Sequence, residues 1–236
     1  MKKVQIKTLA GIFALAFFVT GQIQVYGWSG GSAPQSGQFT VGGRFGGTLG
    51  FTGSFTDVEN MLRTFFSNPD AIASADPELN FTFALYGNYA ITNRISIQTE
   101  LNFLINQGYE LQAPRQERGL DSFDINYSSL DIPLLLRVNF LRYRLFGIMA
   151  GPQISIPIGR LEIYDNRTEM YIEKMNIDSS FSLSLTAGLF GGFRAGLGRV
   201  VGDMRFIFDF DPIQAEGIEF IRRRALTFSL GYEISF

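Results

Sequence analysis

The sequence contains neither cysteine nor histidine among its 236 residues. Without cysteine there are no disulfides, thiolate nucleophiles or thiolate metal ligands. Without histidine the chain lacks the side chain that titrates near neutral pH, an imidazole metal ligand and the base of most hydrolase triads. Enzymatic chemistry would have to depend on carboxylates or lysine. We therefore expect a protein that is not an enzyme and that has no catalytic residues, metal site or cofactor.

The chain also lacks an excess of one charge and, beyond its N-terminal region, any long apolar run. Its 20 Lys+Arg residues are balanced by 22 Asp+Glu residues, which gives no electrostatic reason to expect a nucleic-acid partner. Gly, Pro, Asn, Arg or Asp interrupts each apolar run before it reaches the ~20 residues of a transmembrane helix. The apolar surface of the 24 phenylalanines must therefore be removed from water by a structure other than a transmembrane helix.

The N-terminus has the pattern of a secretory signal peptide. Lys2, Lys3 and Lys7 precede an apolar stretch from Leu9 to Thr20, which has the length of a signal-peptide core and is too short for a membrane anchor. A Gly/Ser/Pro-rich segment with the composition of a flexible linker follows. The predicted organisation is a signal peptide over 1–27, cleaved after Gly21 or Gly27, a lead-in over 28–37 and a β-barrel over 38–236.

From residue 38 onward, apolar residues recur with a period of two, which indicates strands with one apolar face. In ISIQTELNFLI, for example, Ile95, Ile97 and Leu101 alternate with polar residues. About eight segments share the pattern, and several have the ten or so residues with which a tilted strand crosses a bilayer. They cover 38–53, 80–91, 95–105, 127–140, 144–159, 179–193, 200–211 and 226–236.

Short and long connections alternate between these segments, as they do in outer-membrane barrels. A soluble sandwich or lipocalin-like barrel would alternate equally well. Small residues on the polar face and aromatic residues at the strand ends favour the membrane barrel. We predict an all-β fold, a single antiparallel transmembrane barrel in a bacterial outer membrane. The expected short turns lie near 92–94, 141–143 and 194–198, and the expected long loops near 54–79, 106–126, 159–179 and 211–224.

The last segment, LTFSLGYEISF, alternates up to its final aromatic residue. An unpaired strand edge is very costly in lipid, so we expect this strand to pair with the first along its full length. A terminal aromatic residue after alternating apolar residues also resembles the sorting signal that the barrel-assembly machinery reads. The residues that carry this resemblance are Leu226, Phe228, Leu230, Tyr232, Ile234 and Phe236.

Three segments together resemble the PorT-like family of small outer-membrane β-barrel proteins. They are SSLDIPLLLRVNF at 128–140, FGIMAGPQISIPIG at 146–159 and RALTFSLGYEISF at 224–236. The resemblance implies the barrel fold and the outer-membrane location. Because the family includes an accessory protein of type IX secretion, the resemblance also implies a role in protein secretion as an alternative.

If the apolar faces meet lipid, charged side chains must point into the barrel. An eight-stranded barrel is just wide enough for side chains to fill it, so we expect these charges to form a salt-bridged plug. The alternative is a gated proton or ion path, or a carboxylate pair, such as Glu100 with Asp203, that performs acid–base chemistry. The expected cluster is Arg44, Glu100, Arg137, Asp203, Arg205 and Glu233, with Asp131 and Asp209 also facing inward.

Two of the predicted connections carry further signals. Thr56 and Glu59 form a capping box before a short amphipathic helix in the first long loop, which would cover the rim or dock a partner. Its apolar face is Val58, Met61, Leu62, Phe65 and Phe66. Arg222, Arg223 and Arg224 lie at a loop-to-strand junction, and we interpret them as anchors of the rim, with contact to anionic lipid as the alternative.

These observations favour a non-enzymatic envelope scaffold or surface protein that binds a partner through its loops at 54–79 and 159–179. A secretion accessory and a narrow small-solute channel are the alternatives, and an outer-membrane hydrolase is disfavoured by the absence of histidine. Other expected contacts are outer-membrane lipids and, during biogenesis, the assembly machinery.

Overall fold

The computed structural model describes residues 35–52, 74–77, 79–112, 122–140, 145–165, 170–178, 180–215, 218–219 and 222–236. The predicted signal peptide and the predicted loop helix lie outside these residues. No helix in the described part of the chain is long and apolar enough to cross a membrane. The strands are β1 (Phe39–Thr52), β2 (Ser74–Pro77), β3 (Leu79–Ala90), β4 (Ile95–Gln112), β5 (Ser122–Asn139), β6 (Leu145–Asp165), β7 (Met170–Asn176), β8 (Ser182–Ala195), β9 (Gly198–Asp209), β10 (Gln214–Ala215), β11 (Ile218–Glu219) and β12 (Arg223–Ser235).

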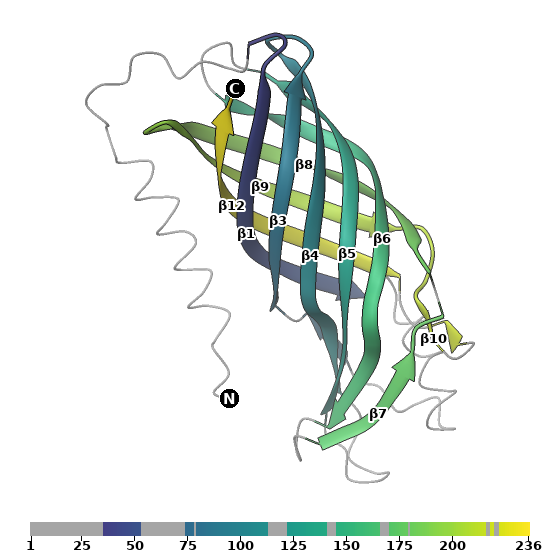
Figure 1. The fold of residues 1–236 in the computed structure, drawn as a ribbon. Helices are drawn as coiled ribbons and strands as arrows, with labels where there is room; N and C mark the ends of the chain where they lie inside the picture. The colour runs from purple at the N-terminus through teal and green to yellow at the C-terminus, as the bar shows by residue number, and fades with distance from the viewer. Residues whose placement is uncertain are drawn as a thin grey trace. The chain divides into compact units, whose positions relative to one another are not determined.

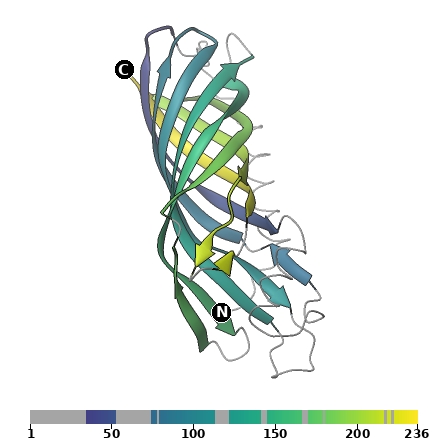
Figure 2. The same cartoon turned by 90° about the vertical axis from the view of Figure 1, so that its right-hand side faces the viewer.

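Eight strands close into an antiparallel barrel, which confirms the predicted fold (Figures 1 and 2). The order around the barrel is β1, β3, β4, β5, β6, β8, β9 and β12, and β12 returns to β1. Apart from the closing pair, each barrel strand pairs with the barrel strands that precede and follow it in the chain. Full closure leaves no unpaired edge around the barrel.

The closing pair extends over the whole of β1 and β12. Their register runs from Thr40 opposite Ser235 to Thr52 opposite Arg223. Beyond it, the Phe236 amide donates a hydrogen bond to the Phe39 carbonyl at 2.8 Å. The expectation that the last strand pairs with the first along its full length is therefore correct.

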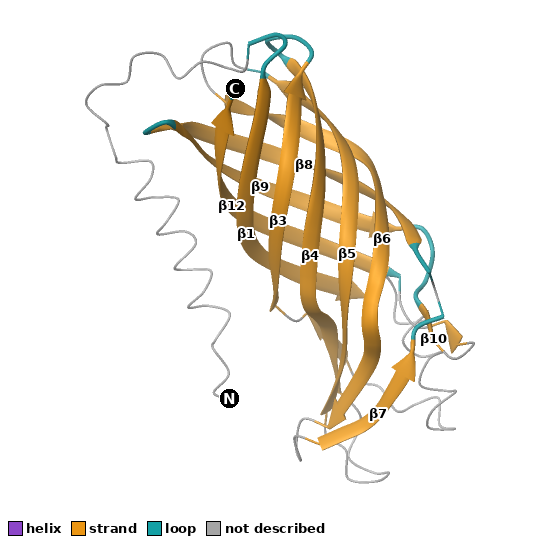
Figure 3. Cartoon of the chain, in the orientation of Figure 1, coloured by secondary structure: helices purple, strands orange, loops and turns teal. Residues whose placement is uncertain are grey.

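Side-chain hydrogen bonds stabilise the short turn between β3 and β4. The hydroxyl oxygen of Thr92 accepts hydrogen bonds from the backbone amides of Arg94 and Ile95, at 3.2 and 3.0 Å. Between β8 and β9, Gly196 adopts a positive φ of 60°, a conformation that favours glycine. Both turns agree with the sequence prediction, and both are drawn as loops at strand ends in Figure 3. We call this end of the barrel the short-turn rim and the opposite end the long-loop rim.

The two faces of the strands differ as the sequence pattern requires. On β3, for example, Phe83, Leu85 and Tyr89 are exposed on the outside of the barrel, whereas Thr82, Ala84 and Asn88 are buried inside it. Large apolar side chains are exposed on the outer face of every barrel strand. Aromatic residues are frequent towards both rims of this face, among them Phe39, Tyr89, Phe140, Phe146 and Tyr232 at the short-turn rim and Phe81, Phe208 and Phe210 towards the long-loop rim.

Several strands continue beyond the ends that the sequence predicts. Strand β4 reaches Gln112, β5 begins at Ser122 and β6 reaches Asp165, where it pairs with β7. The expectation of long loops over 106–126 and 159–179 is therefore wrong for much of both ranges. β-Bulges or irregularities shift the register of the pairing after Leu104 and Asn126. On β5 the buried side chains still alternate across the shift, at Ile125, Tyr127 and Ser129.

The extended strands also bury apolar side chains. Ile125, Leu161 and Ile163 are buried on β5 and β6, and Met175 is buried on β7. Ile213 and Ala215, at β10, are buried as well, and Ala215 forms an isolated bridge with Ile177 next to β7. We refer to β7 and the parts of β4, β5 and β6 beyond these bulges, together with β2, as the strand extension.

Candidate functional site

The barrel interior holds the densest group of charged side chains among the described residues. All six predicted cluster residues point inward, as do Asp131 and Asp209. Two arginines that the sequence analysis does not place inside accompany them. The interior group has five arginines and five carboxylates: Arg44, Arg137, Arg199, Arg205, Arg223, Glu100, Asp131, Asp203, Asp209 and Glu233.

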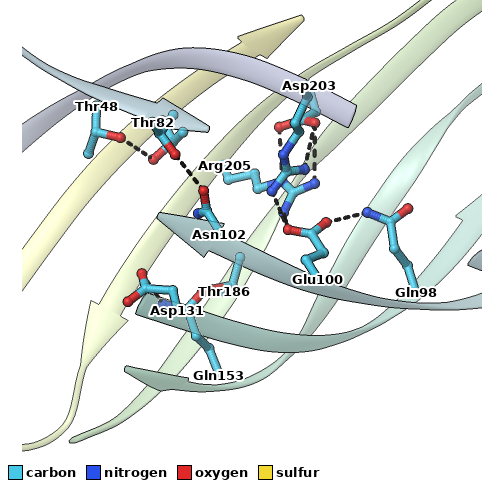
Figure 4. A network of polar contacts seen from close by, with 12 residues as sticks. Thr48, Thr82, Gln98, Glu100, Asn102, Asp131, Gln153, Thr186, Asp203 and Arg205 are labelled. Carbon is cyan, nitrogen blue, oxygen red and sulfur yellow. Dashed lines mark hydrogen bonds and ion pairs between the residues drawn. The ribbon is translucent and has the colours of Figure 1, made fainter. Parts of the chain in front are cut away.

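Four of these residues, from three strands, form a closed ring of ion pairs (Figure 4). Arg205 of β9 binds Glu100 of β4 at 2.7 Å through Nη1, and it binds Asp203 at 2.9 Å through Nε. Arg44 of β1 binds Asp203 at 3.0 Å and forms a second ion pair with Glu100. Each arginine therefore contacts both carboxylates, and the ring links β1, β4 and β9. Such multiple pairing is what allows charges to remain buried.

Three further charged residues lie at the short-turn side of this ring. Gln98 donates to Glu100 and accepts from Arg137, whose guanidinium stacks on Phe190 with 3.9 Å between its carbon and the ring centre. Glu233 forms an ion pair with Arg199 at 2.7 Å. It also accepts a hydrogen bond from the hydroxyl of Tyr86 at 3.1 Å. We call Arg44, Glu100, Arg137, Arg199, Asp203, Arg205 and Glu233 the short-turn-side network.

Tyr86 requires a glycine opposite it. A Cβ atom at Gly42 would lie 2.4 Å from the Tyr86 ring, so a larger residue on β1 would displace the tyrosine. The close approach allows the phenol to pass over β1 and reach Glu233 on β12. The glycines of β1 thus have a packing role that the sequence pattern alone does not reveal.

A second network centres on Arg223, towards the long-loop rim. Its guanidinium binds Asp131 at 2.9 Å and Asp209 at 3.0 Å. Ser155, Ser184 and Gln153 complete the coordination of the three charges through hydrogen bonds of 2.6–2.8 Å. We call Asp131, Asp209 and Arg223 the long-loop-side network. Thr82 and Asn102, joined by a hydrogen bond, extend the polar lining of the interior (Figure 4).

The interpretation of the three consecutive arginines as rim anchors is wrong for Arg223. Strand β12 begins at this residue, three positions before the predicted start, and the alternation then turns its side chain inward, where it is 2% exposed. Arg222 is exposed, and Arg224 faces outward, with its guanidinium over the Phe208 ring at 5.2 Å. Ala225 and Thr227 are both buried, and Arg223 belongs to the same set of alternate positions on β12. This alternation is the signal that identifies Arg223 as an interior residue.

The remaining predicted residues lie as follows. Those of the assembly signal, Leu226, Phe228, Leu230, Tyr232, Ile234 and Phe236, face outward on β12 or, for Phe236, extend just beyond it. No group of three or more acidic residues in the described part of the chain is arranged to hold a metal ion.

The polar, charge-paired interior and the apolar exterior together define a β-barrel that spans a membrane. The sequence over residues 35–213 matches the family described as "outer membrane protein beta-barrel domain". The chain belongs to this family, and the protein resides in the bacterial outer membrane. This result supports the broad part of the resemblance noted in the sequence.

Among solved structures, three outer-membrane proteins are similar to this chain at low sequence identity. OprG of Pseudomonas aeruginosa is 11% identical, with a TM-score of 0.46, over 86% of this chain and 97% of that one. Ail, the attachment invasion locus protein of Yersinia pestis, is 12% identical, with a TM-score of 0.42, over 86% and 100%. Neisserial surface protein A is 9% identical, with a TM-score of 0.43, over 85% and 100%. No curated protein matches the sequence.

Proposed function

We propose that the protein is a non-enzymatic scaffold of the outer membrane, with a lumen that its side chains close and a partner-binding surface on the strand extension. The strand extension is the observation that carries the proposal. It adds paired strands and buried apolar side chains beyond the charged interior, which is more structure than a barrel needs in order to span the membrane. In bacterial barrels the longer connections face the outside of the cell, so this surface would meet macromolecules there.

Strand β7 carries exposed side chains of this surface, at Lys174 and Asn176. Within the described residues it pairs along its length only with β6. Lys174 of β7 binds Glu162 of β6 at 2.9 Å, and the Tyr164 hydroxyl donates to the same carboxylate at 2.6 Å. The Tyr164 hydrogen bond, followed by the one from Lys174, holds the pKa of Glu162 below its usual value. Their stabilisation is therefore present at neutral pH and is lost as the pH falls through the depressed pKa.

The two interior networks support a closed lumen. They cross the barrel between strands that are not neighbours, such as β4 and β9, so opening a path would separate buried ion pairs. Breaking one buried pair typically costs about 3–5 kcal/mol. The closed lumen is therefore favoured over the channel alternative.

A photo-crosslinking amino acid at Lys174 tests the partner surface in intact cells. We expect a discrete adduct with one envelope or surface macromolecule, because this side chain is exposed on β7. The matched control carries the same amino acid at Arg94, which is exposed at the opposite rim. Equal adducts at both positions, or none at Lys174, would count against the proposal.

Gene deletion separates this scaffold role from the secretion role that the PorT-like resemblance implies. The scaffold account predicts an unchanged set of secreted proteins after deletion. Accumulation of secreted cargo in the periplasm would favour the accessory role instead.

A further inference from the structure

A small pocket at the short-turn rim is bounded by buried polar groups. Asn88, Arg137, Asn139 and Glu233 line it from inside the barrel, and residues of the 92–95 turn line it from the rim. The space available to a water-sized occupant is about 10 Å³. That volume is about the minimum for a single water-sized occupant.

Three polar atoms in this pocket have no hydrogen-bond partner among the described residues. They are Nε of Arg137, Nδ2 of Asn139 and Oδ1 of Asn88. All three side chains are at least 96% buried. A buried polar group without a partner costs about 1–3 kcal/mol, so an occupant that satisfies several of these groups at once would be bound favourably.

Both donors are held in place by contacts of their own. The backbone amide of Phe146 donates to Oδ1 of Asn139 at 2.9 Å, which directs Nδ2 of that side chain away from Phe146. Arg137 is held by its hydrogen bond to Gln98 and by its stacking on Phe190. Two preorganised N–H groups therefore line one small space.

The third group, Asn88, is adaptable. Neither end of its amide bonds to a described residue. Rotating the Asn88 amide by 180° therefore breaks no hydrogen bond to a described residue. The rotated amide presents Nδ2 to the pocket in place of Oδ1. The site can thus offer three donors.

The local charge favours an anion. The short-turn-side network contains four arginines and three carboxylates, so it carries one excess positive charge. Arg137 is the arginine of this network that forms no ion pair with a described residue. The carboxylate in the pocket, Glu233, is already bound by Arg199 and Tyr86. An uncompensated buried cation is strongly unfavourable.

We propose that this pocket binds a small monovalent inorganic anion of halide size. The anion accepts hydrogen bonds from Nε of Arg137 and Nδ2 of Asn139, and the turned amide of Asn88 supplies a third. Binding neutralises the short-turn-side network. The site thus adds a chloride-type ligand to the residues that hold the interior together.

Bromide identifies the occupant directly. Crystals of the folded full-length protein grown in sodium bromide should show an anomalous-scattering peak within hydrogen-bonding reach of Arg137 and Asn139. A site that contains water alone, without anomalous signal at high bromide concentration, would overturn the proposal.

Thermal unfolding in detergent gives an independent test. At constant ionic strength, replacing gluconate by chloride should raise the unfolding midpoint by about 3–5 °C for each tenfold increase in chloride above its dissociation constant. The response should be lost in Asn139→Asp, a nearly isosteric change that adds a carboxylate to the pocket. It should also be lost in Arg137→Met.

Asn176→Asp makes the same substitution at an exposed position of β7 and should keep the wild-type response. If Arg137→Met does not fold, Asn139→Asp decides the question. A chloride response that persists in Asn139→Asp, or that gluconate reproduces in the wild type, would contradict the site.

Discussion

Replacing Arg205 by alanine is expected to lower the free energy of unfolding by about 3–5 kcal/mol, the typical cost of breaking a buried ion pair. Arg205 binds both Glu100 and Asp203, and its side chain is 3% exposed. Its removal leaves two buried carboxylates with only Arg44 to balance them. The midpoint of thermal unfolding, followed by the heat-modifiable gel shift, should fall by about 6–20 °C for a protein of this size.

Lys174→Ala is the matched control for this effect. It removes a cation that is also 2.9 Å from a carboxylate, but this pair, with Glu162, is partly exposed. Exposed pairs contribute about 0.2–1 kcal/mol, so the midpoint should change little. Equal midpoints for Arg205→Ala and the wild type would contradict the structural role of the short-turn-side network.

Replacing Leu85 by arginine should destabilise the barrel by about 2–4 kcal/mol, the cost of a basic side chain facing lipid at the bilayer midplane. Leu85 lies at the middle of β3, faces outward and is 51% exposed. Urea unfolding of the protein in lipid vesicles measures the change.

The control for Leu85→Arg is Tyr89→Arg on the same face of β3. Tyr89 lies one residue from the end of the strand, at the short-turn rim, and is similarly exposed, at 50%. An arginine near the interface costs only about 0–1 kcal/mol. If the two variants lost equal stability, the outward face of β3 would not be crossing the bilayer as the barrel requires.

Most of the barrel can be predicted from the sequence because the period of two is a local property. Alternation alone places Arg44, Glu100 and Arg205 inside the barrel, and the cost of an open edge in lipid predicts the pairing of the first and last strands. Identifying which charges touch requires the strand order and register. The ion pair of Arg205 with Glu100, 105 residues away, cannot be inferred from spacing.

The features that the sequence analysis missed were each hidden for a physical reason. Arg199 and Arg223 lie at strand starts next to glycine-rich or arginine-rich stretches, where composition indicates a turn although parity indicates an inward side chain. The strand extension escapes prediction because its apolar residues face inward: on β5 they change from odd positions, such as Ile125 and Tyr127, to even positions, such as Leu134, which face outward. Asn88 and Asn139 look like ordinary polar positions in the sequence, since an unpaired hydrogen-bonding group becomes visible only when its surroundings are known.

The conductance of the folded protein in a planar lipid bilayer tests the central claim, that the interior networks close the barrel. Folding is first verified by the heat-modifiable gel shift, and a porin in the same bilayer shows that small currents are resolved. The account predicts no discrete conductance steps from the wild-type protein in potassium chloride. Reproducible steps would contradict it and would make the charged interior an ion path.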